Sequence, residues 1–329
     1  MERFALAAAV VLGFALTAAL CSLFVPLRRV LERREQNQQP AQSEQPRPAP
    51  LRAPLWGGLC AAAGTVAAVG VGWLAACVGQ PELLGSEGRL MTRLLTALAG
   101  SLAFGAVGLA EDLARMRSPA ALGLRRDVRL LLEALAAAFV LLLLRAAGCL
   151  PRGLGVPGAV LLGSAVPFLW AVLMVVLAEC ARIAERDEGT VCGAAFVAML
   201  ALMMAEAGLG VPGLAVLPAA LAGALVALLL WAFPPARLGV GCCGSLLAAG
   251  AIGCIPLSLD MTSLTVPLAL PFWAAGGLLA AQLLGAKRTG KPLRCWVKKH
   301  KMSPETVFLC SFALSAVGYV LALALLRWC

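Results

Sequence analysis

Ten apolar stretches recur along the 329-residue chain, and short polar or charged segments separate them. Most are long enough to cross the roughly 30 Å hydrocarbon core of a bilayer as an α-helix. The pattern predicts an all-α polytopic membrane protein, with residues 1–329 forming a single integral membrane domain. The predicted spans are 4–25, 56–78, 94–110, 130–149, 156–178, 190–207, 214–233, 244–259, 264–284 and 306–327.

The amino-acid composition supports a membrane protein and excludes other classes of protein. Hydrophobic residues make up 61% of the chain, charged residues 13%, and the mean hydropathy is +0.90, which excludes a soluble globular domain of this length. The run from Phe4 to Val25 is long for a signal-peptide core, and we expect it to be a retained span. The 12 cysteines fall mostly inside apolar runs and form no CxxC motif, so neither a zinc site nor a disulfide framework is indicated.

The basic residues predict the orientation of the spans. All but six of the 27 Lys and Arg residues lie in the loops after spans one, three, five, seven and nine. The positive-inside rule places these loops in the cytoplasm and both termini outside. The net charge of +10 is therefore a topology signal, and no soluble domain is large enough to bind nucleic acid.

Two of the cytoplasmic loops are strongly basic. Residues 27–54 are basic and then rich in Gln and Pro, which predicts a mobile linker. Residues 285–305 can hold an anionic headgroup or a diphosphate, or can serve only as a topology anchor. The candidate ligands in this last loop are Lys291, Arg294, Lys298 and His300.

An acidic pair, Glu111-Asp112, follows the third apolar run. Each charge costs several kcal/mol inside lipid, about 2.5–3.5 on insertion scales, so the pair belongs at the water boundary or in a functional pocket. With Arg115 and Arg129 nearby, it can hold Mg²⁺ and a phosphorylated substrate. The alternative is a solvated helix end with basic residues that keep the loop in the cytoplasm.

Two further loops carry candidate chemistry. The segment from Glu179 through Arg182, Glu185 and Glu188 is dense in charge, and is either a metal- and phosphate-binding cluster or a solvated connector. Between Gly239 and Gly244, glycines can supply backbone N–H groups for an anion at a helix start, although such a turn is weak support by itself.

The motifs, taken in order, resemble those of the polyprenyl-phosphate N-acetylhexosamine-1-phosphate transferases. The stretch 54–58, Pro-Leu-Trp-Gly-Gly, resembles the family's Pro-Thr-Met-Gly-Gly, and 108–112, Gly-Leu-Ala-Glu-Asp, resembles Gly-Phe-x-Asp-Asp. Downstream, Arg115 and Arg129 fall at family lysines and Glu133 at a glutamine. The stretch 235–246 resembles Pro-Ala-x-x-Phe-Met-Gly-Asp-x-Gly-Ser-Leu. The resemblance covers essentially the whole chain.

This resemblance implies a ten-span fold and a cell-envelope activity in the bacterial plasma membrane. A polyprenyl phosphate would attack a UDP-sugar with Mg²⁺ as cofactor, and a homodimer is left open. The implied catalytic residues are Glu111, Asp112, Glu185 and Glu188, with Asp112 and Glu188 at the metal. The implied ligands of the diphosphate are Arg115, Arg129, Arg182, Lys291, Arg294, Lys298 and His300.

Departures from the family pattern leave more than one hypothesis open. Both asparagines of an Asn-x-x-Asn-x-x-Asp motif are absent, and Cys242 replaces an aspartate of the magnesium site, which weighs against a magnesium centre because a thiol suits a hard cation poorly. One hypothesis is a divergent active transferase. Another is a catalytically inactive relative that binds carrier lipid or an envelope-synthesis partner. An unrelated transporter fits less well, since its charges would lie near mid-membrane. The sugar donor is not indicated.

Overall fold

A computed structural model describes residues 2–38, 56–79, 88–117, 123–150, 165–185, 189–211, 213–233, 236–284 and 303–328. Within these ranges every regular element is helical. The elements are α1 (Glu2–Gln38), α2 (Gly57–Gly79), α4 (Gly88–Arg117), α5 (Arg126–Ala146), α6 (Val166–Ala184), α7 (Thr190–Gly208), α8 (Val216–Ala232), α9 (Gly241–Ser258), η2 (Thr262–Leu264), α10 (Thr265–Leu268), α11 (Leu270–Leu284) and α13 (Pro304–Trp328).

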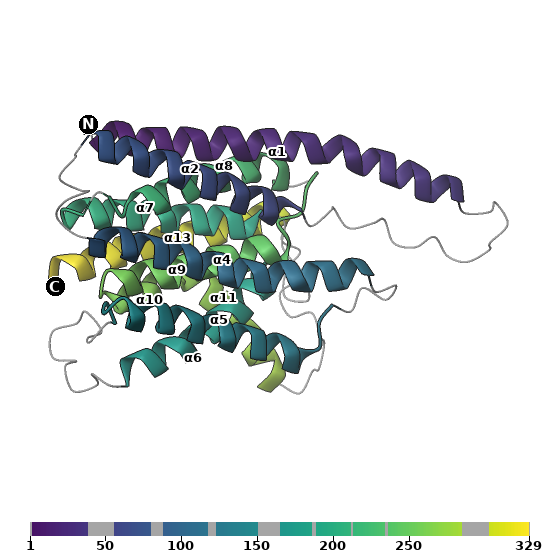
Figure 1. The fold of residues 1–329 in the computed structure, drawn as a ribbon. Helices are drawn as coiled ribbons and strands as arrows, with labels where there is room; N and C mark the ends of the chain where they lie inside the picture. The colour runs from purple at the N-terminus through teal and green to yellow at the C-terminus, as the bar shows by residue number, and fades with distance from the viewer. Residues whose placement is uncertain are drawn as a thin grey trace.

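The helices lie side by side in an elongated bundle (Figure 1). The span of α9 is 100% buried, whereas that of α13 is 17% buried, so α9 forms the centre and α13 the periphery. Along α9 pack α4, α6, α2 and α7, while α1 packs on α2 and α8. Small residues permit this close packing, because lipid tails supply no hydrophobic drive between helices and contact distance decides the attraction.

The prediction of an all-α membrane protein is confirmed. A helix lies at each of the ten predicted spans, and within the described residues seven helices are long and apolar enough to cross a bilayer. These seven are within α1, α2, α4, α6, α7, α9 and α13. The chain is therefore a multi-pass membrane protein, while the total of ten spans and the external termini stay predictions.

Several predicted spans have different boundaries in the structure. The first continues from the expected end at 25 to Gln38, so residues 27–38 of the predicted linker are helical. The third continues from the expected end at 110 to Arg117, so Glu111, Asp112 and Arg115 belong to α4 rather than to a loop. The ninth is broken at Ala269, where φ is −92° and ψ is 10°. Pro271 follows two residues later, and its ring cannot accommodate the helical carbonyl four residues earlier, which explains the break.

One end of the bundle gathers the motif-bearing segments. In Figure 1, α4 ends at the end of the bundle opposite to the start of α1 and the end of α13. There the Gly57 N–H donates to Gly239 O at 3.2 Å, and the Gly58 N–H to Val240 O at 2.9 Å. A Cβ on Gly58 would collide with the Gly244 backbone, so these glycines allow the predicted close backbone approach.

Candidate functional site

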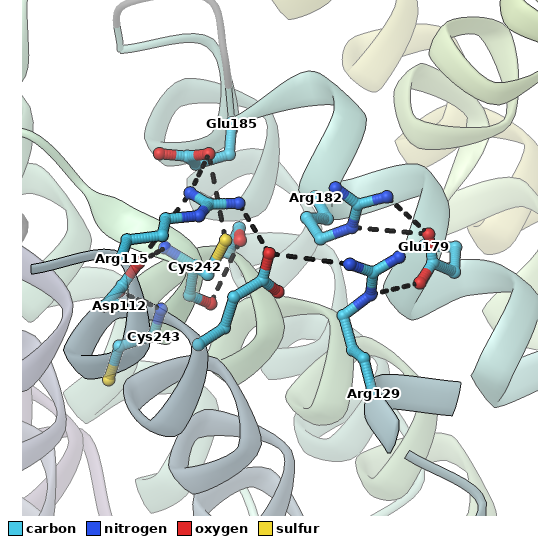
Figure 2. A network of polar contacts seen from close by, with 10 residues as sticks. Asp112, Arg115, Arg129, Glu179, Arg182, Glu185, Cys242 and Cys243 are labelled. Atoms are coloured by element: carbon cyan, nitrogen blue, oxygen red, sulfur yellow. Dashed lines mark hydrogen bonds and ion pairs between the residues drawn. The ribbon is translucent and has the colours of Figure 1, made fainter. Parts of the chain in front are cut away.

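A cluster of seven charged side chains lies at this end of the bundle, between α4, α5 and α6 (Figure 2). Four are acids and three are arginines. We refer to these residues as the charged cluster: Glu111, Asp112, Arg115, Arg129, Glu179, Arg182 and Glu185.

Helical spacing produces the local contacts of the cluster. Glu111 and Asp112 stand four and three residues before Arg115 on α4, so all three share one face of the helix. On α6, Glu179 and Arg182 are likewise three residues apart, and the Arg182 Nη2–Glu179 Oε2 distance is 2.6 Å. Burial is deep on α4, because Glu111 is 2% exposed and Asp112 is 1% exposed.

Asp112 joins α4 to the start of α9. The Cys242 N–H donates to Asp112 Oδ1 at 3.0 Å, and the Cys243 N–H donates to Oδ2 at 2.9 Å. The first N–H groups of a helix have no partner within the helix, and α9 has no capping side chain of its own. Asp112 therefore caps a buried helix, and its charge also complements the positive end of the helix dipole.

The Arg115 guanidinium lies among three carboxylates, as Figure 2 shows. Its Nη2 is 2.6 Å from Glu111 Oε1, and its Nη1 is 3.9 Å from Asp112 Oδ1 and 3.7 Å from Glu185 Oε2. Glu185 is the residue directly after the end of α6. The Arg115 guanidinium therefore occupies the point where the acids of α4 meet Glu185 at the end of α6.

A second chain of contacts runs from α4 to α6 through α5. Arg129 Nη1 is 3.6 Å from Glu111 Oε1, and Arg129 Nε donates to Glu179 Oε1 at 2.6 Å. Glu179 in turn accepts from Arg182. Glu179 thus bridges two arginines from different helices, and charge-assisted hydrogen bonds of this kind are about twice as strong as neutral ones.

Cys242 lies at the edge of the cluster. Its Sγ is 3.9 Å from Glu185 Oε2, within reach of a weak S–H···O bond. The thiol is 0% exposed. Since Cys242 also supplies one of the N–H groups bound by Asp112, one residue of α9 contacts acids of both α4 and α6.

The structure brings six of the predicted site residues together. These six are Glu111, Asp112, Arg115, Arg129, Arg182 and Glu185. The other five, Glu188, Lys291, Arg294, Lys298 and His300, lie outside the described residues, as do the loops at 39–55 and 285–302.

Two acids of this region were not among the predicted site residues. Glu179 holds two arginines, and its position in the charge-dense segment with Arg182 was the available signal. Glu133 is 0% exposed, and neither of its oxygens has a hydrogen-bond partner within the described ranges. It stands one helical turn after Arg129 on α5, a spacing that indicates a shared face.

The arrangement does not fit a magnesium ion. Mg²⁺ needs near-octahedral oxygen ligands at about 2.0–2.1 Å. Both Asp112 oxygens already accept backbone N–H groups, Glu111 Oε1 faces two guanidinium groups, and Arg115 fills the space between Glu111, Asp112 and Glu185. Among the residues that the structure describes, no group of three or more His, Cys, Asp or Glu side chains is placed to hold a metal.

Comparison with known proteins assigns the family. The sequence model described as glycosyl transferase family 4 matches residues 94–260, about half of the chain. The chain belongs to glycosyl transferase family 4. The matched region runs from α4 to the end of α9, so it contains the whole charged cluster and Cys242, and the sequence-based prediction of a divergent family member is confirmed.

One similar protein adds detail to this family assignment. The chain is 32% identical over 213 residues to a phospho-N-acetylmuramoyl-pentapeptide-transferase of Synechococcus sp. (strain RCC307). The match covers 63% of this chain and 55% of that protein, so it spans little more than half the relative's length. Lys291, Arg294, Lys298 and His300 lie beyond the region that the family model matches.

Proposed function

We propose that this member of glycosyl transferase family 4 transfers a sugar 1-phosphate from a UDP-sugar to polyprenyl phosphate in the bacterial plasma membrane. The observation that carries the proposal is the convergence of four carboxylates and three arginines where α4, α5 and α6 meet, with Glu111, Asp112 and Arg129 buried and the other four partly buried. Ionisable groups among membrane helices are costly and mark functional sites by default. The name of the Synechococcus relative describes a transfer of the same class.

In the proposed reaction, an oxygen of the lipid phosphate bonds to the β-phosphorus of the UDP-sugar. The bond from that phosphorus to the oxygen bridging the two phosphates breaks, and UMP leaves with the electron pair. The product is a lipid diphosphate sugar. Negative charge is concentrated on the transferring group, and the guanidinium groups of Arg115, Arg129 and Arg182 supply fixed positive charge around it.

Three of the four carboxylates have distinct proposed roles. Glu111 Oε2 is buried, with no hydrogen-bond partner in the described part of the chain, and we assign it the proton of the lipid phosphate. Asp112 holds the start of α9, and Glu185 holds Arg115. Roles for Glu188, Lys291, Arg294, Lys298 and His300 in binding the diphosphate rest on the sequence.

An assay of UMP release tests the proposal. Purified protein in nanodiscs is given undecaprenyl phosphate and a panel of UDP-sugars, once with Mg²⁺ or Mn²⁺ and once with EDTA. We expect UMP release that needs both the lipid and one donor, and that Glu111→Gln lowers at least 100-fold, at the lower end of general-base contributions. A matched control is Glu305→Gln on the exposed start of α13, which should retain full activity.

A second candidate is a non-catalytic relative that binds polyprenyl phosphate or an envelope-synthesis partner. Two contacts favour it: Asp112 is occupied by the α9 backbone, and a thiol rather than a carboxylate stands beside Glu185. Lipid binding by folded protein, without UMP release from any donor, would support this candidate and overturn the first.

A further inference from the structure

We propose that the Arg115 guanidinium is the built-in cation of this site, so that the site takes its phosphorylated ligand without a divalent metal. For the class of ligand the inference rests on the proposed function. For the exclusion of the metal it rests only on the geometry of the charged cluster.

Arg115 stands where a metal ion shared by the neighbouring acids would bind. Its two terminal nitrogens face Glu111, Asp112 and Glu185 at 2.6, 3.9 and 3.7 Å. A divalent ion bound to these three carboxylates would occupy the same space. Because the guanidinium is always charged at neutral pH, it keeps one positive charge permanently beside these acids and has no need to be loaded.

Asp112 is already engaged in hydrogen bonds with the backbone of α9. Both of its oxygens accept N–H groups from the first turn of α9, a helix whose span is 100% buried. A metal that drew Asp112 away would leave two buried N–H groups without a partner, and an unsatisfied buried donor carries its full desolvation penalty. The same carboxylate therefore cannot turn toward a metal without loosening the central helix.

Cys242 places a sulfur atom, rather than an oxygen, beside Glu185. Its thiol lies 3.9 Å from Glu185 Oε2, so the neighbour of Glu185 on α9 is a soft sulfur ligand and not an oxygen. Soft thiolates are poor partners for Mg²⁺ and similar hard ions. This residue removes the oxygen that a metal would need on the α9 side.

The guanidinium groups of Arg129 and Arg182 can donate hydrogen bonds to a phosphate. A guanidinium carries five N–H groups, whereas the hydrogen bonds to Glu179 employ one nitrogen of Arg129 and two nitrogens of Arg182. Planar, bidentate donors suit phosphate oxygens. These two arginines, with Arg115, provide the charge that a divalent ion would otherwise bring.

Thermal unfolding in EDTA and in Mn²⁺ tests the exclusion of the metal. Mn²⁺ is the probe because it favours the same oxygen ligands as Mg²⁺ and its binding is visible by electron paramagnetic resonance. We expect the midpoint of the wild-type protein to be unchanged by Mn²⁺. Arg115→Gln removes the guanidinium that stands between the acids, so its midpoint should fall in EDTA. Glu111 and Glu185, which do not cap α9, can then take Mn²⁺, and the midpoint should recover by several degrees.

Matched variants make the result specific. Arg182→Gln removes a guanidinium from the same cluster whose hydrogen bonds go to Glu179, on the far side of the cluster from Asp112, so the variant should lose stability without gaining a response to Mn²⁺. Arg115→Lys keeps a charge and should also show no response. An equal Mn²⁺ response in wild type and Arg115→Gln, or no response in Arg115→Gln, would overturn the proposal.

Two measurements on the wild-type protein test the inference without relying on the folding of Arg115→Gln. Titration of wild-type protein with Mn²⁺, followed by the resonance of the free ion, should show no stoichiometric site, and a site that Glu185→Gln abolishes would contradict the inference. Undecaprenyl phosphate should raise the wild-type midpoint equally in EDTA and in Mn²⁺, whereas a rise only in Mn²⁺ would overturn it. No rise in either condition would instead defeat the proposed function and leave the metal result intact.

Discussion

The Asp112 carboxylate and the Cys242 backbone are joined across 130 residues of sequence by a hydrogen bond of 3.0 Å. With the bond from Cys243, it fixes the start of the most buried helix, α9, against the charged end of α4. The position of Cys242 beside Glu185 follows from this contact, because the thiol is carried by the same residue. Asp112 therefore links the stability of the bundle to the geometry of the site.

Asp112→Asn should destabilise the protein, because an amide offers one acceptor oxygen where the carboxylate offers two. One N–H of the first α9 turn then lacks a partner, and we expect a loss of about 1–3 kcal/mol in the free energy of unfolding. Unfolding in mixed micelles measures this change. Asp127→Asn, at an exposed position in the first turn of α5, is the control and should change stability by less than about 0.5 kcal/mol. Equal losses in the two variants would contradict the capping role.

Gly108→Ala should displace α9 from α4. A Cβ at this position would collide with the carbonyl of Cys242, and overpacking of this kind costs about 1–3 kcal/mol. The matched control is Gly70→Ala on α2, where no atom of the described residues lies within 4 Å of the added Cβ. Since alanine favours a helix over glycine, the control should be neutral or slightly stabilising. A comparison of thermal midpoints decides between the two sites.

Glu133→Gln should leave the protein as stable as before or make it more stable. The side chain is 0% exposed, and neither oxygen has a hydrogen-bond partner among the described residues, so an amide of the same shape removes a buried acid whose ionisation is unfavourable. Glu179→Gln should have the opposite effect, because it leaves Arg129 and Arg182 without their shared acid. We expect a loss of up to about 3–5 kcal/mol there. A loss on Glu133→Gln as large as that on Glu179→Gln would show that Glu133 has a partner.

Cys242→Asp should lower stability, because it buries a second carboxylate next to Glu185 at a position that is 0% exposed. Cys242→Ser, similar in size and uncharged, should lose much less. While Arg115 is present, we expect no rescue of Cys242→Asp by Mn²⁺, whereas the double variant with Arg115→Gln should be rescued. Thermal midpoints in EDTA and Mn²⁺ measure both effects, and rescue of the single variant would contradict the role given to Arg115.

Much of the fold could be predicted from the sequence, because long apolar runs have few alternatives to a helix in lipid. The boundaries of α4 could not, since Glu111, Asp112 and Arg115 are charged and a hydropathy pattern ends where charge begins. Their ion pairs at helical spacing, together with burial against α9, let the helix continue to Arg117. The break at Ala269 is local, and Pro271 was a visible signal for it.

The membership of the site was predicted in part. Glu111, Asp112 and Arg115 stand close together in the sequence, so their proximity needed no knowledge of the fold. The bridge from Arg129 through Glu179 to Arg182 depends on how α5 packs on α6, and charge density alone does not give that packing. For the same reason, Asp112 was expected at a metal, whereas the structure shows it capping α9.

The most direct test of the proposed activity is UMP release by purified wild-type protein in EDTA, with undecaprenyl phosphate and each UDP-sugar in turn. We predict release that requires the lipid, survives removal of divalent ions, and is lost in Glu111→Gln. Folded protein that binds the lipid yet releases no UMP from any donor, with or without Mg²⁺ or Mn²⁺, would contradict it.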